Sequence, residues 1–229
     1  MPTPDRSVLL AQLQRLPYFS GLPSGTLQGL VDLATWHEYG PGAVVFLEGE
    51  TNAGLYSVQS GWIKVVKFAL DGREQVLRYF GPGEAFSEIG LFLARPNPAT
   101  AVALEQSGIW RLHRTHLQPL LVARPDLLLH VMGNMADRIA YLADMVADLS
   151  LRTVEVRLAR LLIDEASAGT LVRQSWLTQA ELAARLGTVP EVLNRALRVL
   201  ADAGIIQVDR RQITILDQPA LAQRAQTAV

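Results

Sequence analysis

Four side chains with hydrogen-bonding groups stand at helical spacing near the end of the chain. Glu191, Asn194, Arg195 and Arg198 occupy positions i, i+3, i+4 and i+7, so they share one face if this segment is a helix. Carboxylate, amide and guanidinium groups on one helix face fit the base edges in a DNA major groove. The alternative interpretation is an ordinary αα-hairpin whose polar face is only solvated.

The surrounding residues predict the two helices that would position this face. Thr178 and Glu181 form the capping box of a first helix, and Gly187 follows it where a left-handed residue is favoured. Pro190 stands at the start of a second helix, where its missing N–H is not needed. The opposite face of that second helix is apolar: Val192, Leu193, Ala196, Leu197 and Leu200. Residues 177–200 are therefore predicted to form a helix-turn-helix.

The segment that follows strengthens this prediction. From Ile205 to Leu216, apolar and polar residues alternate on both sides of Asp209-Arg210-Arg211, as in a β-hairpin. Arginines at the tip of a hairpin can reach phosphates while the preceding helix contacts bases. The pattern is typical of a winged helix-turn-helix.

Composition bounds the kind of protein. The chain has 229 residues, of which 49% are apolar and 19% charged, which is typical of one large or two modest globular domains. No apolar run approaches the ~20 residues of a membrane helix, and the N-terminus lacks a signal-peptide pattern, so we expect a cytoplasmic protein with no membrane partner. The absence of cysteine excludes disulfides, thiolate zinc sites and cysteine-held iron–sulfur clusters.

Charge is unevenly divided along the chain, although the formal net charge is −1. After Leu149 there are ten basic and eight acidic residues, whereas up to that point there are eleven and fourteen. The excess of positive charge at the C-terminal end favours a nucleic-acid partner there.

The N-terminal half predicts a β-structure that follows two short helices. Residues 5–35 carry two helical patterns, and from Trp36 to Leu112 short apolar runs alternate with glycine-containing turns. Evenly spaced short strands with such turns predict an antiparallel sandwich or barrel. The segment 86–93 interrupts the strands and is expected to form a short helical turn.

A long helix is predicted from Asp126, after a short helix at 114–121. Its apolar residues follow the 4-3-4-3-4-3 spacing of a heptad seam: Leu128, Met132, Met135, Ile139, Leu142, Val146 and Leu149. Because further apolar residues lie beside the seam, we expect the helix to pack both on the sandwich and on a copy of itself. The alternative is a helix wholly inside one chain. An amphipathic helix at 151–166 begins a C-terminal domain.

Together these segments resemble the Crp/Fnr transcription regulators over nearly the whole chain. The most specific segments are SGWIKVVKFALDGREQVLRYFGPGEAFSEIGLF, RPDLLLHVMGNMADRI and TQAELAARLGTVPEVLNRALRVLADAGII. The resemblance implies an α+β fold. It comprises an N-terminal antiparallel β-roll (a cyclic-nucleotide-binding-like double-stranded β-helix) at 1–125, a long dimerisation helix at 126–149 and a C-terminal winged helix-turn-helix at 150–229.

The resemblance also implies a homodimeric regulator, not an enzyme, whose partners are double-stranded DNA, RNA polymerase and a small-molecule effector. It is closest to the Fnr and Dnr-like branch, which reads a palindrome of TTGA-type half-sites with Glu, Ser and Arg. Glu191 and Arg195 match that pattern, and Asn194 replaces the serine, which leaves the outer base open. Arg195 could pair bidentately with guanine and Glu191 with cytosine, the two side chains being held together by an i, i+4 pair.

The other DNA-binding candidates include residues suited to the phosphate backbone. They are Thr178, Thr188, Arg198, Arg210 and Arg211.

The effector site departs from that of the cyclic-nucleotide members of the family. Glu88 stands where those members have the acidic residue that takes a ribose hydroxyl, but Pro98-Ala99 replaces their phosphate-binding Arg-Ser. Leu142-Ala143 replaces the Thr-Ser pair that binds adenine. Cyclic AMP is therefore disfavoured, since its phosphate would lack a counter-charge. The expected pocket residues are Phe86, Ser87, Glu88, Ile89, Arg95, Thr100, Tyr141 and Leu142.

Haem stays open as a cofactor, because the Dnr-like and CO-sensing branches use it. A haem needs an axial ligand, but each histidine also fits a surface or hydrogen-bonded role, so none is assigned: His37, His113, His116 and His130. An alternative function is a DNA-binding protein that needs no effector and whose β-roll core is filled. No G-x-S-x-G, P-loop or H-E-x-x-H motif indicates an enzyme.

Overall fold

A computed structural model describes residues 4–16, 19, 22–51, 54–88, 95–123 and 125–226, with the side chains of 121 and 123–131 left undescribed. The residues form two compact units. The first comprises Met1–Lys67 and Leu77–Ile139, and the second comprises Phe68–Val76 and Ala140–Val229. Within the described residues, no helix is both long enough and apolar enough to span a bilayer.

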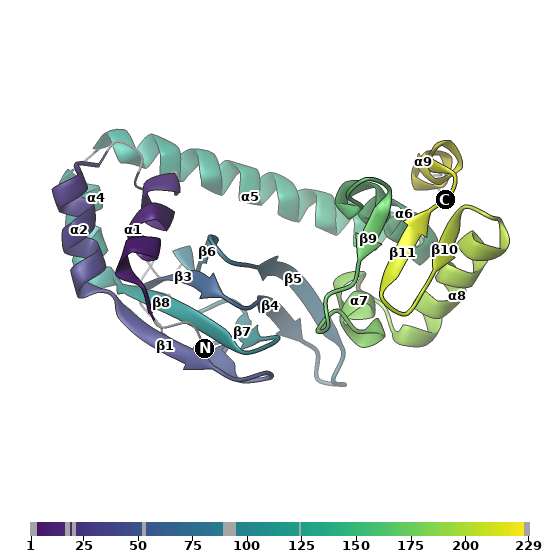
Figure 1. Ribbon diagram of the computed structural model, residues 1–229, viewed down its shortest axis with the longest axis horizontal. Helices are drawn as coiled ribbons and strands as arrows, with labels where there is room; N and C mark the ends of the chain where they lie inside the picture. The colour runs from purple at the N-terminus through teal and green to yellow at the C-terminus, as the bar shows by residue number, and fades with distance from the viewer. Residues whose placement is uncertain are drawn as a thin grey trace. The chain divides into compact units, whose positions relative to one another are not determined.

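The first unit contains two four-stranded sheets, as expected for an antiparallel sandwich or roll (Figure 1). One sheet has the order β1 (Thr35–Tyr39), β8 (Ser107–His113), β3 (Gly54–Ser60), β6 (Ala85–Phe86). The other has the order β2 (Val44–Phe46), β7 (Thr100–Ala103), β4 (Ile63–Phe68), β5 (Glu74–Phe80). The registered pairs β1–β8, β3–β8, β3–β6, β2–β7 and β4–β7 are antiparallel, which confirms the predicted β-roll.

Alternation along β3 places two cores on opposite faces of its sheet. Leu55 packs with Leu9 and Leu13 of α1 (Arg6–Arg15) and with Leu30 of α2 (Ser24–Leu33). Tyr56 instead faces an aromatic cluster with Phe46, Phe80 and Phe86, in which ring centroids lie 5.2–6.1 Å apart. The two N-terminal helices therefore cover one sheet face, while the other face encloses the roll interior.

Two helices follow the last strand of the roll. α4 (Arg114–Ala123) continues directly from β8, and α5 spans Pro125–Leu151. The long helix therefore extends slightly beyond the predicted 126–149, a difference within the usual fraying of helix ends. The helical turn expected at 86–93 falls mostly on residues outside those described.

The second unit contains the predicted winged helix-turn-helix and two elements that were not predicted. α6 (Val154–Glu165) begins at Thr153, whose Oγ1 accepts from Val156 N at 3.4 Å. α7 (Gln179–Arg185) and α8 (Pro190–Asp202) follow, then the hairpin of β10 (Ile206–Val208) and β11 (Gln212–Ile215). The additional elements are β9 (Thr170–Val172), which pairs with β11, and the final helix α9 (Gln218–Gln226).

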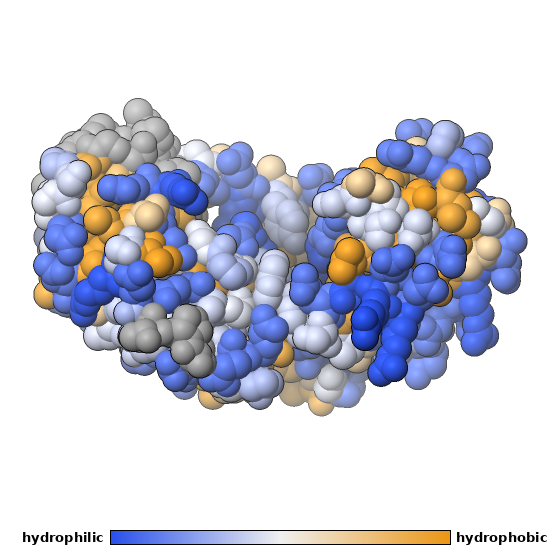
Figure 2. Space-filling view, in the orientation of Figure 1, coloured by the Kyte–Doolittle hydropathy of each residue, from blue (hydrophilic) through white to orange (hydrophobic). Residues whose placement is uncertain are grey.

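The β10–β11 hairpin exposes its two tip arginines. Val208 pairs with Ile213, and Asp209 N donates to Gln212 O at 2.8 Å to close the turn. Arg210 and Arg211 are both exposed at this turn. Figure 2 shows strongly hydrophilic side chains gathered near the place where Figure 1 draws the hairpin.

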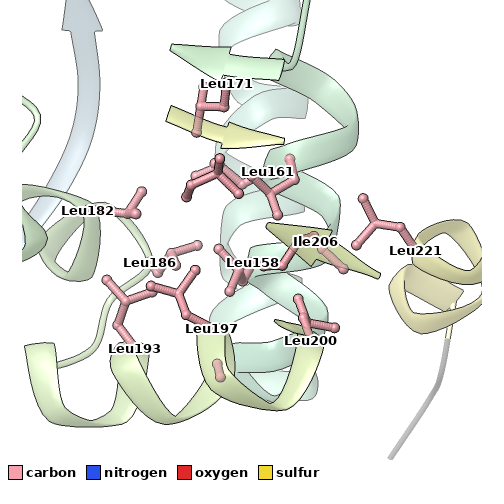
Figure 3. Packing of buried hydrophobic residues seen from close by; sticks show 14 of the residues in the cluster. Leu158, Leu161, Leu171, Leu182, Leu186, Leu193, Leu197, Leu200, Ile206 and Leu221 are labelled. Atoms are coloured by element: carbon pink, nitrogen blue, oxygen red, sulfur yellow. The ribbon is translucent and has the colours of Figure 1, made fainter. Parts of the chain in front are cut away.

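One apolar core holds the second unit together. Figure 3 shows leucines from α6, α7 and α8 pointing toward one another, with Ile206 of β10 and Leu221 of α9 beside them. Leu158, Leu193 and Leu200 are fully buried. The apolar face that periodicity predicted for α8 is therefore its packing face.

We expect Leu193→Ala to lower the free energy of unfolding of the second unit by about 2–5 kcal/mol, because it opens a cavity in this core. The measurement is denaturant unfolding of the full chain. Val208→Ala is the matched control: Val208 is 36% exposed, and its truncation should cost less than about 1 kcal/mol. Equal effects of the two substitutions would contradict the assignment of this core.

Candidate functional site

The polar face of α8 is open to solvent. Glu191, Arg195 and Arg198 are exposed and Asn194 is half-buried, and the four line one open groove. The opposite face carries the buried Leu193, Ala196, Leu197 and Leu200. Because the buried face fixes the rotation of the helix, the four polar side chains are all presented on the outside.

Backbone geometry at the turn explains how α7 leads into α8. Thr178 Oγ1 accepts from Glu181 N at 3.2 Å, which caps the start of α7. At the other end, Thr188 N donates to Ala183 O at 2.9 Å and Gly187 N to Ala184 O at 3.3 Å, the pair of bonds of a Schellman motif. Gly187 has a φ of 62°, so the left-handed residue that the sequence predicted is present.

One expected contact of the polar face is not formed. Among the ion pairs of the described residues, none joins Glu191 to Arg195, so the predicted i, i+4 pair does not hold Arg195 in this structure. Of the residues suited to backbone contacts, Thr178 is exposed and Thr188 is half-buried. Both lie at the ends of the α7–turn segment, close in sequence to the polar face.

A second cluster of polar residues lies in the first unit at the end of β6. Phe86 is fully buried, and Glu88 is 3% exposed. The Glu88 carboxylate forms an ion pair with Arg138 of α5, and the Arg138 guanidinium also lies 5.8 Å from the Phe80 ring centroid. Arg138 was not among the predicted site residues, because a single arginine on a long amphipathic helix gives no signal of its partner.

Backbone strain accompanies this cluster. Ser87 has a φ of 71°, which is rare for a residue other than glycine, and its buried Oγ has no hydrogen-bond partner among the residues that the structure describes. Such strain is typical of functional sites.

Two further pocket candidates, Arg95 and Thr100, lie in the loop before β7 and at the start of that strand. Arg95 is exposed, and the buried Thr100 accepts from Glu48 N at 3.0 Å through its Oγ1. Lys67 Nζ donates to Pro98 O at 2.9 Å. Thus a cation lies beside Pro98, but Lys67 also pairs with the Glu48 carboxylate.

Of the three remaining predicted pocket residues, Ile89 lies outside the described residues. Tyr141 and Leu142 of α5 are 45% and 42% exposed.

The α5 seam is largely uncovered within one chain. The exposed members are Met132 (65%), Ile139 (68%), Leu142 (42%), Val146 (62%) and Leu149 (36%). Met135 instead packs against the cluster formed by α1, α2 and their sheet. The side chain of Leu128 is outside those described.

The described histidines have local contacts. His37 Nε2 lies 3.0 Å from Thr35 Oγ1, and burial together with the nearby Arg111 charge lowers the pKa of His37. His113 Nδ1 lies 2.9 Å from Thr115 Oγ1, and its ring centroid is 6.2 Å from that of His116. Burial, and then the charges of Arg111 and His116, lower the pKa of His113. The side chain of His130 is outside the described part.

Two family models match the two halves of this architecture. The model described as "Cyclic nucleotide-binding domain" matches residues 36–124, and the one described as "Crp-like helix-turn-helix domain" matches residues 156–224. The first match covers the sheets of the roll and the second covers α7, α8 and the β10–β11 hairpin.

Relatives match over nearly the full length. A CRP-like cAMP-activated global transcriptional regulator of Mycobacterium tuberculosis is 29% identical over 219 residues, covering 93% of this chain and 98% of the relative. The Cyclic AMP receptor protein of Thermus thermophilus is 30% identical over 215 residues, covering 89% and 96%.

A solved structure agrees with the fold. FixK2 from Bradyrhizobium japonicum superposes with a TM-score of 0.74 at 23% identity, covering 86% of this chain and 99% of that one. With both family models in chain order and a 30% identical relative matched almost end to end, the protein belongs to the Crp/Fnr family of DNA-binding transcription regulators.

Proposed function

We propose that the chain regulates transcription as a homodimer that reads a palindrome of TTGA- or TGA-type half-sites through α8. The observation that carries the proposal is the groove lined by Glu191, Asn194, Arg195 and Arg198 on a helix whose other face is buried. Arg195 gives two parallel hydrogen bonds to guanine O6 and N7, and Glu191 accepts from a cytosine amino group. Asn194 pairs with adenine or contacts a phosphate.

The branch assignment rests on this same face. Glu191 and Arg195 match the Fnr and Dnr-like pattern, although the relatives from Mycobacterium tuberculosis and Thermus thermophilus carry names that refer to cyclic AMP. The flanking candidates Thr178, Thr188, Arg210 and Arg211 contact phosphates, which set the register of the helix in the groove but carry no sequence information.

The homodimer is formed by α5. Five seam residues between 36% and 68% exposed make an apolar strip that a soluble monomer would leave in contact with water. A second copy of the same helix covers it, because the heptad spacing is self-complementary. We assign residues 1–125 to the effector domain, 126–149 to dimerisation and 150–229 to DNA binding. RNA polymerase is the further partner that the family implies.

The effector of the roll is a molecule other than cyclic AMP, although relatives carry that nucleotide in their names. Of the described cations on this side of the roll, Arg138 pairs with Glu88 and Lys67 pairs with Glu48, while Arg95 is exposed to solvent. A cyclic phosphate would have to displace a carboxylate to gain a counter-charge from Arg138 or Lys67. At the adenine end, Leu142 and Ala143 offer no hydroxyl.

A second candidate is an effector-independent regulator. It is favoured by the roll interior, where Phe46, Tyr56, Phe80 and Phe86 are 5% exposed or less and their rings touch. An absorption spectrum and a native mass of the purified protein separate the two candidates. A Soret band or a small-molecule adduct supports an effector, and the bare mass supports the second candidate.

Arg195→Ala should lower affinity for the selected site by roughly 1–3 kcal/mol and remove the preference at one base pair, because the bidentate guanine contact is lost. Arg210→Ala is the matched control. It should weaken binding to all sequences about equally and reduce the salt slope by about one. Randomised-site selection is the measurement. Full discrimination by the Arg195 variant would show that α8 is not the recognition helix.

The double substitution Ile139→Asp with Val146→Asp should convert the dimer to a monomer, because it places like charges in an apolar seam. Both residues are exposed in one chain, so its own core is untouched. Sedimentation at micromolar concentration measures the mass. Val122→Asp, at another exposed site on α4, should leave the dimer intact. A monomeric wild type would contradict the proposal.

Cyclic AMP should bind no better than millimolar. A lost charge-assisted contact is worth about 1.5–3 kcal/mol, and each 1.4 kcal/mol is about tenfold in affinity. The double variant Pro98→Arg with Ala99→Ser should bind cyclic AMP more tightly in calorimetry, because it restores the phosphate-binding Arg-Ser pair. A micromolar dissociation constant for the wild type, lost on Glu88→Ala, would overturn the effector proposal.

A further inference from the structure

The end of α7 is completed by a side chain from a different helix. The Schellman bonds engage the carbonyls of Ala183 and Ala184, but the carbonyl of Leu186 lies beyond them. Arg157 of α6 supplies its donor: Nη1 lies 2.5 Å from Leu186 O. A carbonyl at a helix end needs such a donor, and a cation is favoured there by the negative end of the helix dipole.

The surroundings of Arg157 differ from those of the other arginines around α6. Arg185 pairs with Glu165 and Arg224 with Glu155, each at 2.6 Å. Among the described residues no carboxylate pairs with Arg157, and its buried Nε has no hydrogen-bond partner. Burial alone lowers the pKa of Arg157. The half-buried Arg157 guanidinium therefore donates to the Leu186 carbonyl at the turn without an acidic partner among the described residues.

The bonded carbonyl belongs to the turn that leads into α8. The Leu186–Gly187 peptide leads directly into Gly187, whose φ of 62° reverses the chain. A Cβ built on Gly187 would come within 3.2 Å of Arg157 Nη1, so the guanidinium lies against the turn itself. Rotation of that peptide would change the angle between α7 and α8.

We propose that Arg157 is a positioning residue for DNA recognition, whose guanidinium fixes the turn and hence the angle at which α8 enters the major groove. The proposal rests on the proposed recognition by α8. Arg195 lies five residues into that helix, about 8 Å along its axis, so a small tilt displaces its guanidinium. A bidentate base contact does not tolerate this displacement, whereas phosphate contacts do.

The expected signature is therefore a loss of specificity with no loss of electrostatic affinity. Arg157→Met keeps the length of the side chain and removes its donors. It should weaken binding to the selected site roughly tenfold and leave binding to a scrambled duplex unchanged, with the same salt slope. If the substitution only destabilised the protein, the fraction of folded protein would fall and binding to both duplexes would weaken equally. The ratio of the two affinities would then stay the same.

The experiment compares four full-length proteins by fluorescence anisotropy with the selected and the scrambled duplex at several salt concentrations. They are wild type, Arg157→Met, Arg157→Lys and Arg160→Met. Arg157→Lys should recover most of the specificity ratio, because an ammonium can reach the same carbonyl. Arg160→Met removes the same charge from α6 at a residue that faces Asp148, 3.6 Å away, and should keep the ratio.

Each other outcome overturns the proposal. An unchanged ratio in Arg157→Met shows that the turn does not depend on Arg157. Equal losses on both duplexes, with a salt slope lower by about one, show a direct phosphate contact instead. If Arg157→Met does not fold, Arg157→Gln replaces it in the comparison, and a wild-type ratio in that variant contradicts positioning. A wild type with no sequence preference contradicts the proposed function itself.

Discussion

The burial of one face of α8 is the constraint on which the DNA-binding unit depends. Leu193, Leu197 and Leu200 insert among the leucines of α6, so α8 has one rotation about its own axis. Every polar residue of the recognition face then takes its direction from that rotation. The turn before α8 sets the second angle, and there the backbone conformation of Gly187 and the donor from Arg157 act together. One apolar constraint, the buried face, and one polar constraint, the hydrogen bond at the turn, thus set the orientation of α8.

The effector unit obeys a different constraint, that of placing charge inside an apolar roll. Glu88 is almost fully buried, and a buried carboxylate without compensation is very unfavourable. Arg138 compensates it from α5, the helix that also carries the exposed seam. The same helix therefore neutralises the Glu88 charge and carries the exposed seam of the proposed dimer. Loss of the Glu88 ion pair would leave Arg138 of α5 without its carboxylate partner.

Local patterns predicted those parts of the protein whose causes are local in sequence. The capping residues Thr178 and Gly187, the periodicity of α8 and the alternation along the hairpin each specify a structure over a few residues, and all were found. β9 and α9 were missed because a three-residue strand and a short polar-rich helix are stabilised by distant partners, β11 and α6. Arg138 and Arg157 were missed for the same reason: their acceptors lie fifty and twenty-nine residues away in the chain. The expected pairing of Glu191 with Arg195 was wrong in this structure, because i, i+4 spacing permits an ion pair on an exposed face but gains little from it.

That missing ion pair has a consequence for the thermodynamics of recognition. Since no ion pair of the described residues ties Glu191 to Arg195, both long side chains keep rotamer freedom before the proposed contact with DNA. Forming base contacts then removes conformational entropy of roughly 1–2 kcal/mol for each side chain. Only a sequence whose bases satisfy both side chains offsets that loss with hydrogen-bond enthalpy. In the proposed recognition, discrimination between sites would accordingly be enthalpic in origin and would weaken as temperature rises.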